Sequence, residues 1–591
     1  MGMITWPRAA VHRVTVERDL PVPMRDGVIL LADHYAPVGA VRPPTILVRS
    51  PYGRRGMFGR TFGRGFARHG FQVVMQSCRG GFGSGGLLDP LGDEHDDGLA
   101  TLAWLRDQDW YGGSLAMHGP SYLGYAQWAV APFAGPDLKA VSISVAASQF
   151  RDAAYVGGAF ALESSLMWTT LTASMERPFS GANALLIPRR TRRAALSGRP
   201  LGELDALSAG RGVPFFQDLL THHAEPAAYW GRRDFSASVG EVEAAVTMVG
   251  GWYDVFLPWQ VKDYAAMRAA GRRPYLTIGP WYHADVRHGR VANAEALAWF
   301  RAHLLGDPSG LREQPVRLYV TGADEWRDYS DWPVPGVREQ RWRLRPGFAL
   351  SPDAPGLPGA LDAPGTPDAP GALDALDAPH VPGVPEADGV PGGGDSSGGP
   401  GGTGGSGGPY GAGTDRFRYD PAHPTPALGG PVLLGNSEPR DNRRLEARRD
   451  VLVYTGPELR RDTEMIGPVF ADLYVRSGTG HADVVVRVCD VHPDGASYNV
   501  CEGVRRLVPG DPPADADGIR RVRVDLWPIG HRFRRGHRIR VHVAGGAYPR
   551  IARNLGTGEP LGTGSAMVTT DHEIFHDPSH PSAVVLPLAP S

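Results

Sequence analysis

Alternating strand and helix patterns in the first third of the chain restrict the fold more than any other feature. Short runs of consecutive apolar and β-branched residues occur at 45–50, 71–77, 114–119 and 138–147. Strands of this kind are buried on both faces, as in a parallel sheet. Residues 93–108 open on acidic residues and then follow a helical pattern. This β-α-β succession predicts a parallel sheet with helices on its faces, preceded by a hairpin at Asp26-Gly27.

The pattern changes after residue 150 and again after residue 314. Residues 150–239 are helical and irregular, which predicts a cap inserted into an α/β core formed by residues 1–149 and 240–314. From 315 to 591 short strands follow one another without helices, so we expect a C-terminal β-sandwich domain. A Pro- and Gly-rich stretch at about 351–414 interrupts this domain, and its composition predicts a disordered loop.

Composition excludes several classes of partner. The formal net charge is −2 over 591 residues, which gives no support to a nucleic-acid partner. Three cysteines cannot form a disulfide framework in a chain of this length, and we find neither a signal peptide nor a membrane span. We therefore expect a cytoplasmic protein without a membrane partner. A homodimer is compatible with these features, which do not determine the oligomeric state.

Ser121 stands in a pattern that predicts an exposed nucleophile. The stretch "GPSYLG" at residues 119–124 lies between a strand pattern and a helix pattern. A sharp strand-to-helix turn needs flanking glycines, because side chains there would collide. The usual pattern is G-x-S-x-G, whereas here the second glycine comes one residue late. Ser121 alone is therefore a weak candidate that needs partners.

Two later strand ends supply these partners in the chain order Ser, Asp, His that α/β-hydrolases use. Asp254 follows the strand pattern at 245–251, and His283 follows the one at 275–279. Because the carboxyl ends of parallel strands meet at the same edge of a sheet, we expect the three side chains to converge there. A serine hydroxyl becomes a nucleophile when a neutral imidazole takes its proton and a carboxylate fixes the imidazole tautomer.

The negative oxygen that forms on a substrate also needs hydrogen-bond donors held in place beforehand. The backbone N–H of Tyr122, directly after the nucleophile, is the first candidate. The Tyr52 hydroxyl in "RSPYGRRG" (49–56), after an early strand, is the second.

Three other features could suggest a different base or a metal site. His288 is a second candidate base, but His283 lies closer to the strand end. The acidic cluster at 93–97 suits the first turn of a helix better than a metal site. Cys489 and His492 have the spacing of zinc ligands, but the second pair that such a site requires is missing. We therefore expect no metal and no other cofactor.

Taken together, the motifs resemble the cocaine-esterase-like (CocE/NonD) hydrolases and their relatives, the X-Pro dipeptidyl-peptidases and α-amino-acid ester hydrolases. The resemblance runs in one order along nearly the whole chain and rests on "RSPYG", "CRGGFGSGG", "DEHDDGLATLAWL", "GPSYLGYAQW", "GGWYD", "GPWYH", "YVTGADEWRDYSDWP" and "DLWPIGHRFRRGHRIRVHV". It implies an α/β-hydrolase core, a helical cap and a C-terminal jelly roll. It assigns Ser121 as nucleophile, Asp254 as orienting acid and His283 as base. It also implies that Trp168 and Phe256 line an acyl pocket.

The function expected from these features is hydrolysis of a small carboxylic ester through an acyl-enzyme. The alternative within the same family is an X-Pro dipeptidyl-peptidase or an amide acylase, which needs an acid such as Glu163 to hold a free amino group. An alternative from another class is a non-enzymatic jelly roll that binds carbohydrate or a partner chain. The substrate in the enzymatic hypotheses is a small ester or amide.

Overall fold

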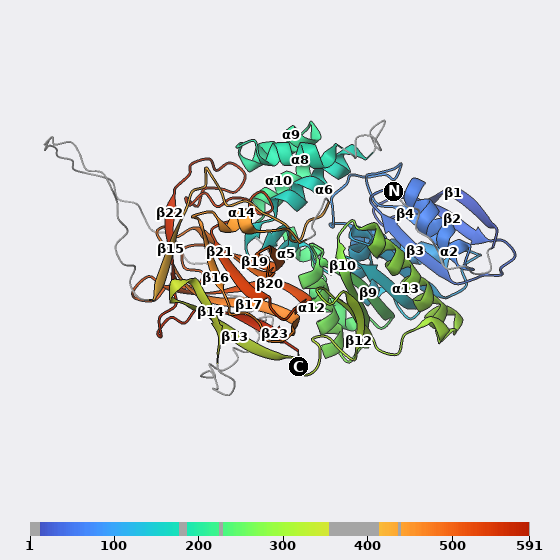
Figure 1. Cartoon of the computed structure of the whole chain (residues 1–591). Helices are drawn as coiled ribbons and strands as arrows, with labels where there is room; N and C mark the ends of the chain where they lie inside the picture. The colour runs from blue at the N-terminus through green and yellow to red at the C-terminus, as the bar shows by residue number, and fades with distance from the viewer. Residues whose placement is uncertain (1–11, 176–185, 224–228, 354–412, 435–438, 590–591) are drawn as a thin grey trace, which may run out of the picture.

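The computed structural model describes residues 12–175, 186–223, 229–353, 413–434 and 439–589. Figure 1 shows three parts: a mixed sheet with its helices at the right, an all-β part at the left, and a group of helices above the two. The loop expected at about 351–414 falls mainly on residues 354–412, which lie outside the described residues.

The first sheet has the strand order β1-β2-β4-β3-β5-β6-β9-β10-β11-β12. Its central strands from β4 to β11 are parallel, as the continuous apolar runs of all of them but β11 predict, while β1, β2 and β12 pair antiparallel at the two edges. The strands are β1 (Val14–Pro23), β2 (Ile29–Pro37), β3 (Thr45–Ser50), β4 (Gln72–Ser77), β5 (Leu115–Pro120), β6 (Leu138–Ser144), β9 (Ala245–Tyr253), β10 (Tyr275–Tyr282), β11 (Val316–Val320) and β12 (Glu325–Tyr329).

This sheet continues past residue 314, where we expected the α/β core to end. β11 pairs parallel with β10, and β12 returns antiparallel beside β11. The alternating apolar residues of β11 suit a sheet edge as well as a sandwich, so the sequence pattern alone does not separate the two locations. The hairpin expected at Asp26-Gly27 joins β1 to β2.

Helices connect the parallel strands and cover the faces of the sheet. The longer ones are α3 (Glu94–Arg106), α4 (Tyr122–Trp128), α12 (Leu257–Ala269) and α13 (Val286–Leu305), and short turns α1 (Gly56–Phe58), η1 (Gly59–Arg64) and α2 (Gly65–Ala67) follow β3. Each crossover returns the chain to the start of the next parallel strand, which brings all the loops after the strands to one edge.

The cap between β6 and β9 is mostly helical. It contains α5 (Arg151–Ala154), α6 (Leu162–Ser174), α8 (Ile187–Ala195), α9 (Leu204–Ala209) and α10 (Pro214–Thr221). It also holds a small hairpin, β7 (Tyr155–Val156) and β8 (Ala159–Phe160), which the sequence pattern did not predict. Its turn residue Gly157 has φ 53°, and a Cβ there would lie 1.8 Å from the carbonyl oxygen of Val504. The hairpin thus fits closely against the all-β part.

The C-terminal strands form a closed ring where we expected a sandwich of two sheets. Within the described residues nine strands pair in the cyclic order β17-β20-β19-β18-β21-β16-β14-β13-β23, and β23 pairs again with β17. The strands of the ring are β13 (Arg338–Arg345), β14 (Ala349–Pro352), β16 (Val451–Thr455), β17 (Thr463–Ser477), β18 (Ala482–Val491), β19 (Ser497–Leu507), β20 (Arg520–Phe533), β21 (Arg538–Ala544) and β23 (Ala583–Leu588). Two further strands, β22 (Thr570–Phe575) and β15 (Thr414–Tyr419), extend the sheet beyond β17, and a short helix, α14 (Arg443–Glu446), precedes β16.

The length of β17 explains why the ring closes. One edge of this strand pairs with β20, while its other edge pairs with β23 along its first part and with β22 along its last. The all-β prediction is confirmed, but the pairing gives a barrel and not a clear jelly roll. Two joints of the barrel, β14 with β16 and β19 with β20, rest on a single residue pair each.

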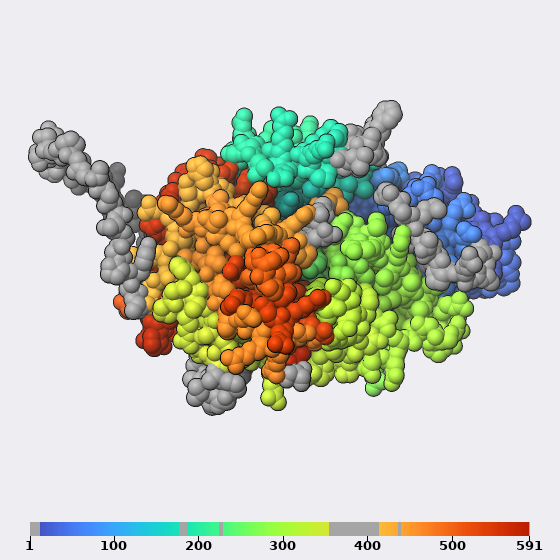
Figure 2. All heavy atoms as spheres, in the orientation of Figure 1, coloured from blue at the N-terminus to red at the C-terminus, as the bar shows by residue number. Residues whose placement is uncertain are grey.

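The barrel and the first sheet share one apolar core. At their junction the backbone N–H of Thr321, just past β11, donates to the Gly530 carbonyl, and the N–H of Arg532 donates back to the Thr321 carbonyl, at 2.9 and 2.8 Å. Figure 2 shows the two parts in continuous surface contact below the cap. Among the described residues, no helix combines the length and the apolar character that crossing a membrane requires.

Candidate active site

Ser121 lies on a strained turn between β5 and α4. Its backbone has φ 58° and ψ −128°, in a region that residues with a side chain rarely adopt. Its N–H donates to the Ser144 carbonyl of the neighbouring strand at 2.9 Å, and its carbonyl accepts the first hydrogen bonds of α4. This conformation turns the side chain out at the carboxyl edge of the sheet, as the sequence predicts.

The structure explains why the second glycine of the motif comes late. A Cβ on Gly119 would lie 2.3 Å from the Cβ of Leu123 in the first turn of α4. A Cβ on Gly124 would lie 2.6 Å from the Cβ of Ala146, just past β6. Both glycines therefore serve the close packing of α4 on its own sheet, and the second one is required where the helix passes β6.

His283 and Asp254 complete a hydrogen-bonded relay with Ser121. His283 Nε2 lies 2.9 Å from Ser121 Oγ, and His283 Nδ1 lies 2.6 Å from Asp254 Oδ2. Asp254 follows β9 and is fully buried, and His283 follows β10. The second carboxylate oxygen of Asp254 accepts the backbone N–H of Phe256 at 2.8 Å. All three predicted side chains thus meet at one edge of the sheet.

The competing base His288 lies elsewhere. It is buried on α13 with its ring against Trp281, at 5.7 Å between ring centres. Burial lowers the pKa of His288 to about 4, which keeps its imidazole neutral. His283 is the imidazole that faces Ser121.

The two predicted donors stand beside Ser121. The backbone N–H of Tyr122 follows the turn directly, and the Tyr52 hydroxyl is within hydrogen-bonding reach of the Ser121 side chain. Trp168 of the cap donates its indole N–H to the Tyr52 oxygen at 2.9 Å. Burial raises the pKa of Tyr52 to about 12, so the phenol keeps its proton near neutral pH. The Trp168 bond occupies the oxygen and leaves that proton available for donation.

A buried ionic group beneath Tyr122 was not predicted as part of the site. Glu94 at the start of α3 accepts the Tyr122 hydroxyl at 2.9 Å and forms an ion pair with the fully buried Arg49 at 2.8 Å. We interpreted the acidic cluster at 93–97 as a helix first turn. α3 does begin there, but Glu94 faces inward and anchors the residue that supplies the backbone donor. The Cys78 thiol lies 3.7 Å from Glu94, and burial raises the pKa of this thiol.

Apolar side chains surround the space in front of the triad. Phe256 packs on His283 and stacks on Phe150, at 5.4 and 4.3 Å between ring centres. Trp168 stacks on Tyr122 at 6.1 Å. Met167 and Ile187 of the cap, Val255 next to Asp254, and Leu433 of a barrel loop complete this cluster. Phe256 thus contacts His283, while Trp168 contacts the two predicted donors Tyr52 and Tyr122.

Comparison with known proteins gives the family. The family model described as X-Pro dipeptidyl-peptidase (S15 family) matches residues 26–285, and the one described as X-Pro dipeptidyl-peptidase C-terminal non-catalytic domain matches residues 310–585. Cocaine esterase of Rhodococcus sp. (strain MB1 Bresler) is 32% identical, over 97% of this chain and 98% of the relative. The chain belongs to the cocaine-esterase-like (CocE/NonD) hydrolases. It is a serine hydrolase that acts on esters or peptides.

Solved structures at lower identity agree on the fold. An aminopeptidase from the marine sediment archaeon Thaumarchaeota archaeon superposes with a TM-score of 0.76 at 20% identity, over 100% of this chain and 99% of its own. An α-amino acid ester hydrolase gives a TM-score of 0.73 at 20% identity, over 99% of this chain and 98% of its own. This CocE/NonD hydrolase thus shares its fold with one protein described as an aminopeptidase and with another described as an ester hydrolase.

The C-terminal barrel of this CocE/NonD hydrolase reaches the triad through Trp527. Its indole N–H donates to the backbone carbonyl of Asp254 at 2.9 Å, although the two residues lie 273 positions apart. Trp527 belongs to the motif "DLWPIG", which is part of the family resemblance but was assigned no role at the site. Nothing local in the sequence connects it to Asp254, so only the tertiary structure reveals this support.

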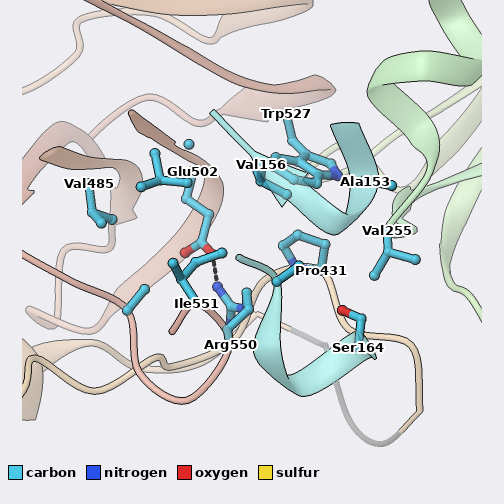
Figure 3. Close-up of a pocket in the computed structure, with 14 residues that line it drawn as sticks. Ala153, Val156, Ser164, Val255, Pro431, Val485, Glu502, Trp527, Arg550 and Ile551 are labelled. Carbon is cyan, nitrogen blue, oxygen red and sulfur yellow. Dashed lines mark ion pairs between the residues drawn. The ribbon is translucent and has the colours of Figure 1, made fainter. Parts of the chain in front are cut away.

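A small cavity lies behind the loop of Asp254, between the cap and the barrel. Figure 3 shows Val255, Ser164, Trp527 and Pro431 around it, with the ion pair of Arg550 and Glu502 on one side. Its volume is about 30 Å³, roughly the space of one water molecule.

Glu163, the candidate for holding a substrate amine, is directed to this ionic side of the cap. Its backbone N–H donates to the Arg550 carbonyl at 3.3 Å. Burial raises the pKa of Glu163, while the charges of Arg550 and Arg192 act in the opposite direction. The charges of two guanidinium groups thus act on this carboxylate without outweighing its burial.

Proposed function

We propose that this CocE/NonD hydrolase cleaves small carboxylic esters through an acyl-enzyme, with Ser121, His283 and Asp254 as its triad. Ser121 Oγ attacks the ester carbonyl carbon while His283 Nε2 takes the hydroxyl proton. The tetrahedral intermediate then expels the alcohol, which receives that proton from His283. Water attacks the acyl-enzyme next, with the same imidazole as base, and the carboxylic acid leaves. Asp254 holds the Nδ1 proton of His283 and stabilises the imidazolium.

The continuous relay from Ser121 through His283 to Asp254 carries this proposal. Its two distances, 2.9 and 2.6 Å, lie within the range for proton transfer along hydrogen bonds. The Tyr52 hydroxyl and the Tyr122 N–H serve as the oxyanion hole. We expect the loss of one such donor to reduce kcat about 10²- to 10³-fold.

The surroundings of the triad favour an apolar acyl group over one with a free amine. Phe256 packs on His283 and Trp168 stacks on Tyr122, and we assign these two side chains to the acyl pocket, whereas Glu94 meets the Tyr122 hydroxyl behind it. Burying an ammonium against the two aromatic rings without a counter-ion would cost several kcal/mol. The amine-binding candidate Glu163 is itself subject to the charges of Arg550 and Arg192. An uncharged aliphatic or aromatic acyl group meets no such cost.

Replacement of the nucleophile tests the mechanism. Ser121→Ala should reduce hydrolysis of p-nitrophenyl butyrate by at least about 10⁴-fold, because the hydroxyl is the attacking group. It should also abolish labelling by a fluorophosphonate probe. Ser197→Ala, the same change at an exposed cap residue, should leave both readouts unchanged. Normal turnover in Ser121→Ala would exclude the triad.

The amide alternative has its own support in the S15 family match. A comparison of Ala-Pro-p-nitroanilide with p-nitrophenyl acetate, butyrate and benzoate separates the two. We expect kcat/KM for the best ester to exceed that for the anilide by at least about 100-fold, since the pocket must desolvate the free amine of the anilide. A preference for the anilide would favour the dipeptidyl-peptidase.

A further inference from the structure

A second cluster of chemically capable side chains lies at the junction of the barrel and the first sheet. It borders a cavity of about 670 Å³. Tyr253, Pro280, Tyr319 and Thr321 line this cavity from the first sheet, and Asp490, His492, His531 and His537 line it from the barrel. β20, which carries His531, contacts β11 across this junction. None of the four barrel residues takes part in the triad.

Asp490 is the centre of the cluster. Its carboxylate is almost fully buried at the end of β18, and one oxygen lies 2.8 Å from His537 Nδ1. The other oxygen lies 3.2 Å from His531 Nε2 and 3.8 Å from His492 Nε2. One buried carboxylate thus lies close to three imidazoles.

The geometry suits three ligands of one metal ion. One ligand atom each from Asp490, His492 and His537 lies within 4.8 Å of the other two. In a tetrahedral zinc site with bonds of about 2.0–2.1 Å, neighbouring ligand atoms are about 3.3 Å apart. Changes of up to about 1.5 Å in these separations would meet this geometry. His492 is the side chain that has room to move, because 39% of it is exposed.

His531 contacts Asp490 without being one of the three proposed ligands. Its Nε2 faces Asp490, and its Nδ1 lies 2.9 Å from the Thr321 hydroxyl, which belongs to the first sheet. Metal-binding carboxylates are usually held by such second partners. The three guanidinium groups along the same cavity are engaged elsewhere: Arg287 with Asp285, Arg532 with Glu464, and Arg534 with the Gly322 carbonyl.

We propose that Asp490, His492 and His537 bind a divalent transition-metal ion of the zinc class, with a fourth position open to the cavity. Imidazole and carboxylate ligands suit zinc, nickel and cobalt, whereas calcium and magnesium prefer oxygen ligands alone. All three ligands come from the barrel, and Thr321 joins them to the first sheet through His531. A bound ion therefore stabilises the face on which the barrel meets the hydrolase core.

The sequence analysis considered zinc ligands in this strand, but with Cys489 and not with its neighbour Asp490. We considered Cys489 with His492 and expected no metal, because a second pair was missing. Successive residues of a strand point to opposite faces. The Cys489 side chain accordingly faces His542, 3.8 Å from its Nε2, while its neighbour Asp490 faces the cavity. Cys489 thus belongs to a separate group with Glu446 and His542, away from the three residues at the cavity.

Zinc titration of metal-free protein tests the proposal. The triad also offers an imidazole and a carboxylate, so His283→Ala serves as the background in every sample. In that background we expect one zinc ion per chain by isothermal titration calorimetry at pH 7.5. Adding His492→Ala should weaken binding at least about 10-fold, and His537→Ala should do the same. His492 is partly exposed, so the first replacement spares the fold.

The matched control is His423→Ala. His423 also pairs with a single aspartate, Asp420, at 2.9 Å, but its side chain is 84% exposed. Zinc affinity should stay within about twofold of the background protein. Equal zinc affinity with and without His492, or a larger loss at His423, would overturn the proposal. Anomalous scattering from a zinc-soaked crystal gives an independent reading: a peak between His492 and His537 supports the site, and a peak only elsewhere refutes it.

Discussion

The hydrogen bond between Trp168 and Tyr52 can be measured with a double-mutant cycle. Trp168→Phe removes the indole N–H that holds the Tyr52 oxygen at 2.9 Å and keeps an aromatic ring against Tyr122. A neutral hydrogen bond of this kind contributes about 0.5–1.5 kcal/mol. Because the bond orients a donor needed mainly in the transition state, kcat should fall about 2- to 13-fold with little change in KM.

The second arm of the cycle removes the proposed donor itself. Tyr52→Phe should reduce kcat about 10²- to 10³-fold. In that background Trp168→Phe has no hydrogen bond left to break, so it should cost only the change in packing. The sum of the two single-mutant effects should therefore exceed the effect of the double mutant by about 1 kcal/mol, or roughly 5-fold in kcat. The assay is hydrolysis of p-nitrophenyl butyrate by all four proteins. Strictly additive effects would refute the orienting role of Trp168.

Three further predictions concern the framework. Glu94→Gln leaves the buried Arg49 without its counter-charge, so we expect a loss of about 3–5 kcal/mol in unfolding free energy, measured by urea denaturation; an unchanged midpoint would contradict it. Burial raises the pKa of Asp263 to about 7 from 3.8. The stabilising contribution of Asp263 is therefore complete below pH 3.8 and is lost as the pH rises to about 7. Across that window the unfolding free energy of Asp263→Asn should rise relative to the parent protein by up to about 4 kcal/mol, and a difference that does not change with pH would argue against it. Gly124→Ala places a methyl group 2.6 Å from the Ala146 Cβ and should cost about 1–3 kcal/mol in unfolding free energy, whereas Gly212→Ala, which has no atom within 4 Å and no positive φ, should cost little.

Local patterns were sufficient for the central sheet and for the positions of the triad residues. The parallel strands are continuous apolar runs, and each candidate side chain follows one of them, so topology alone brings Ser121, Asp254 and His283 to one edge. The barrel was harder to predict, because its closure depends on how the two edges of β17 divide among three partners. Alternation of apolar residues gives the strand but not its neighbours.

The supporting contacts of the site could not be read from the sequence for a related reason. Glu94 has the same local pattern whether it faces solvent at a helix start or pairs with a buried arginine on β3. Trp527 looks like any aromatic residue in a strand until the fold brings it to Asp254. In both residues the role depends on a partner tens or hundreds of positions away, and one sequence carries no record of that pairing.

The indole of Trp527 on the Asp254 carbonyl has a practical meaning for anyone who shortens this enzyme. Trp527 lies in the region that matches the family model of a C-terminal non-catalytic domain, yet its indole N–H holds the backbone carbonyl of Asp254. A truncated chain that ends after the first sheet would expose the Asp254 loop and lose that anchor at the same time. Minimal versions of the enzyme should therefore be built by trimming the Pro- and Gly-rich insertion, with the cap and the barrel left whole.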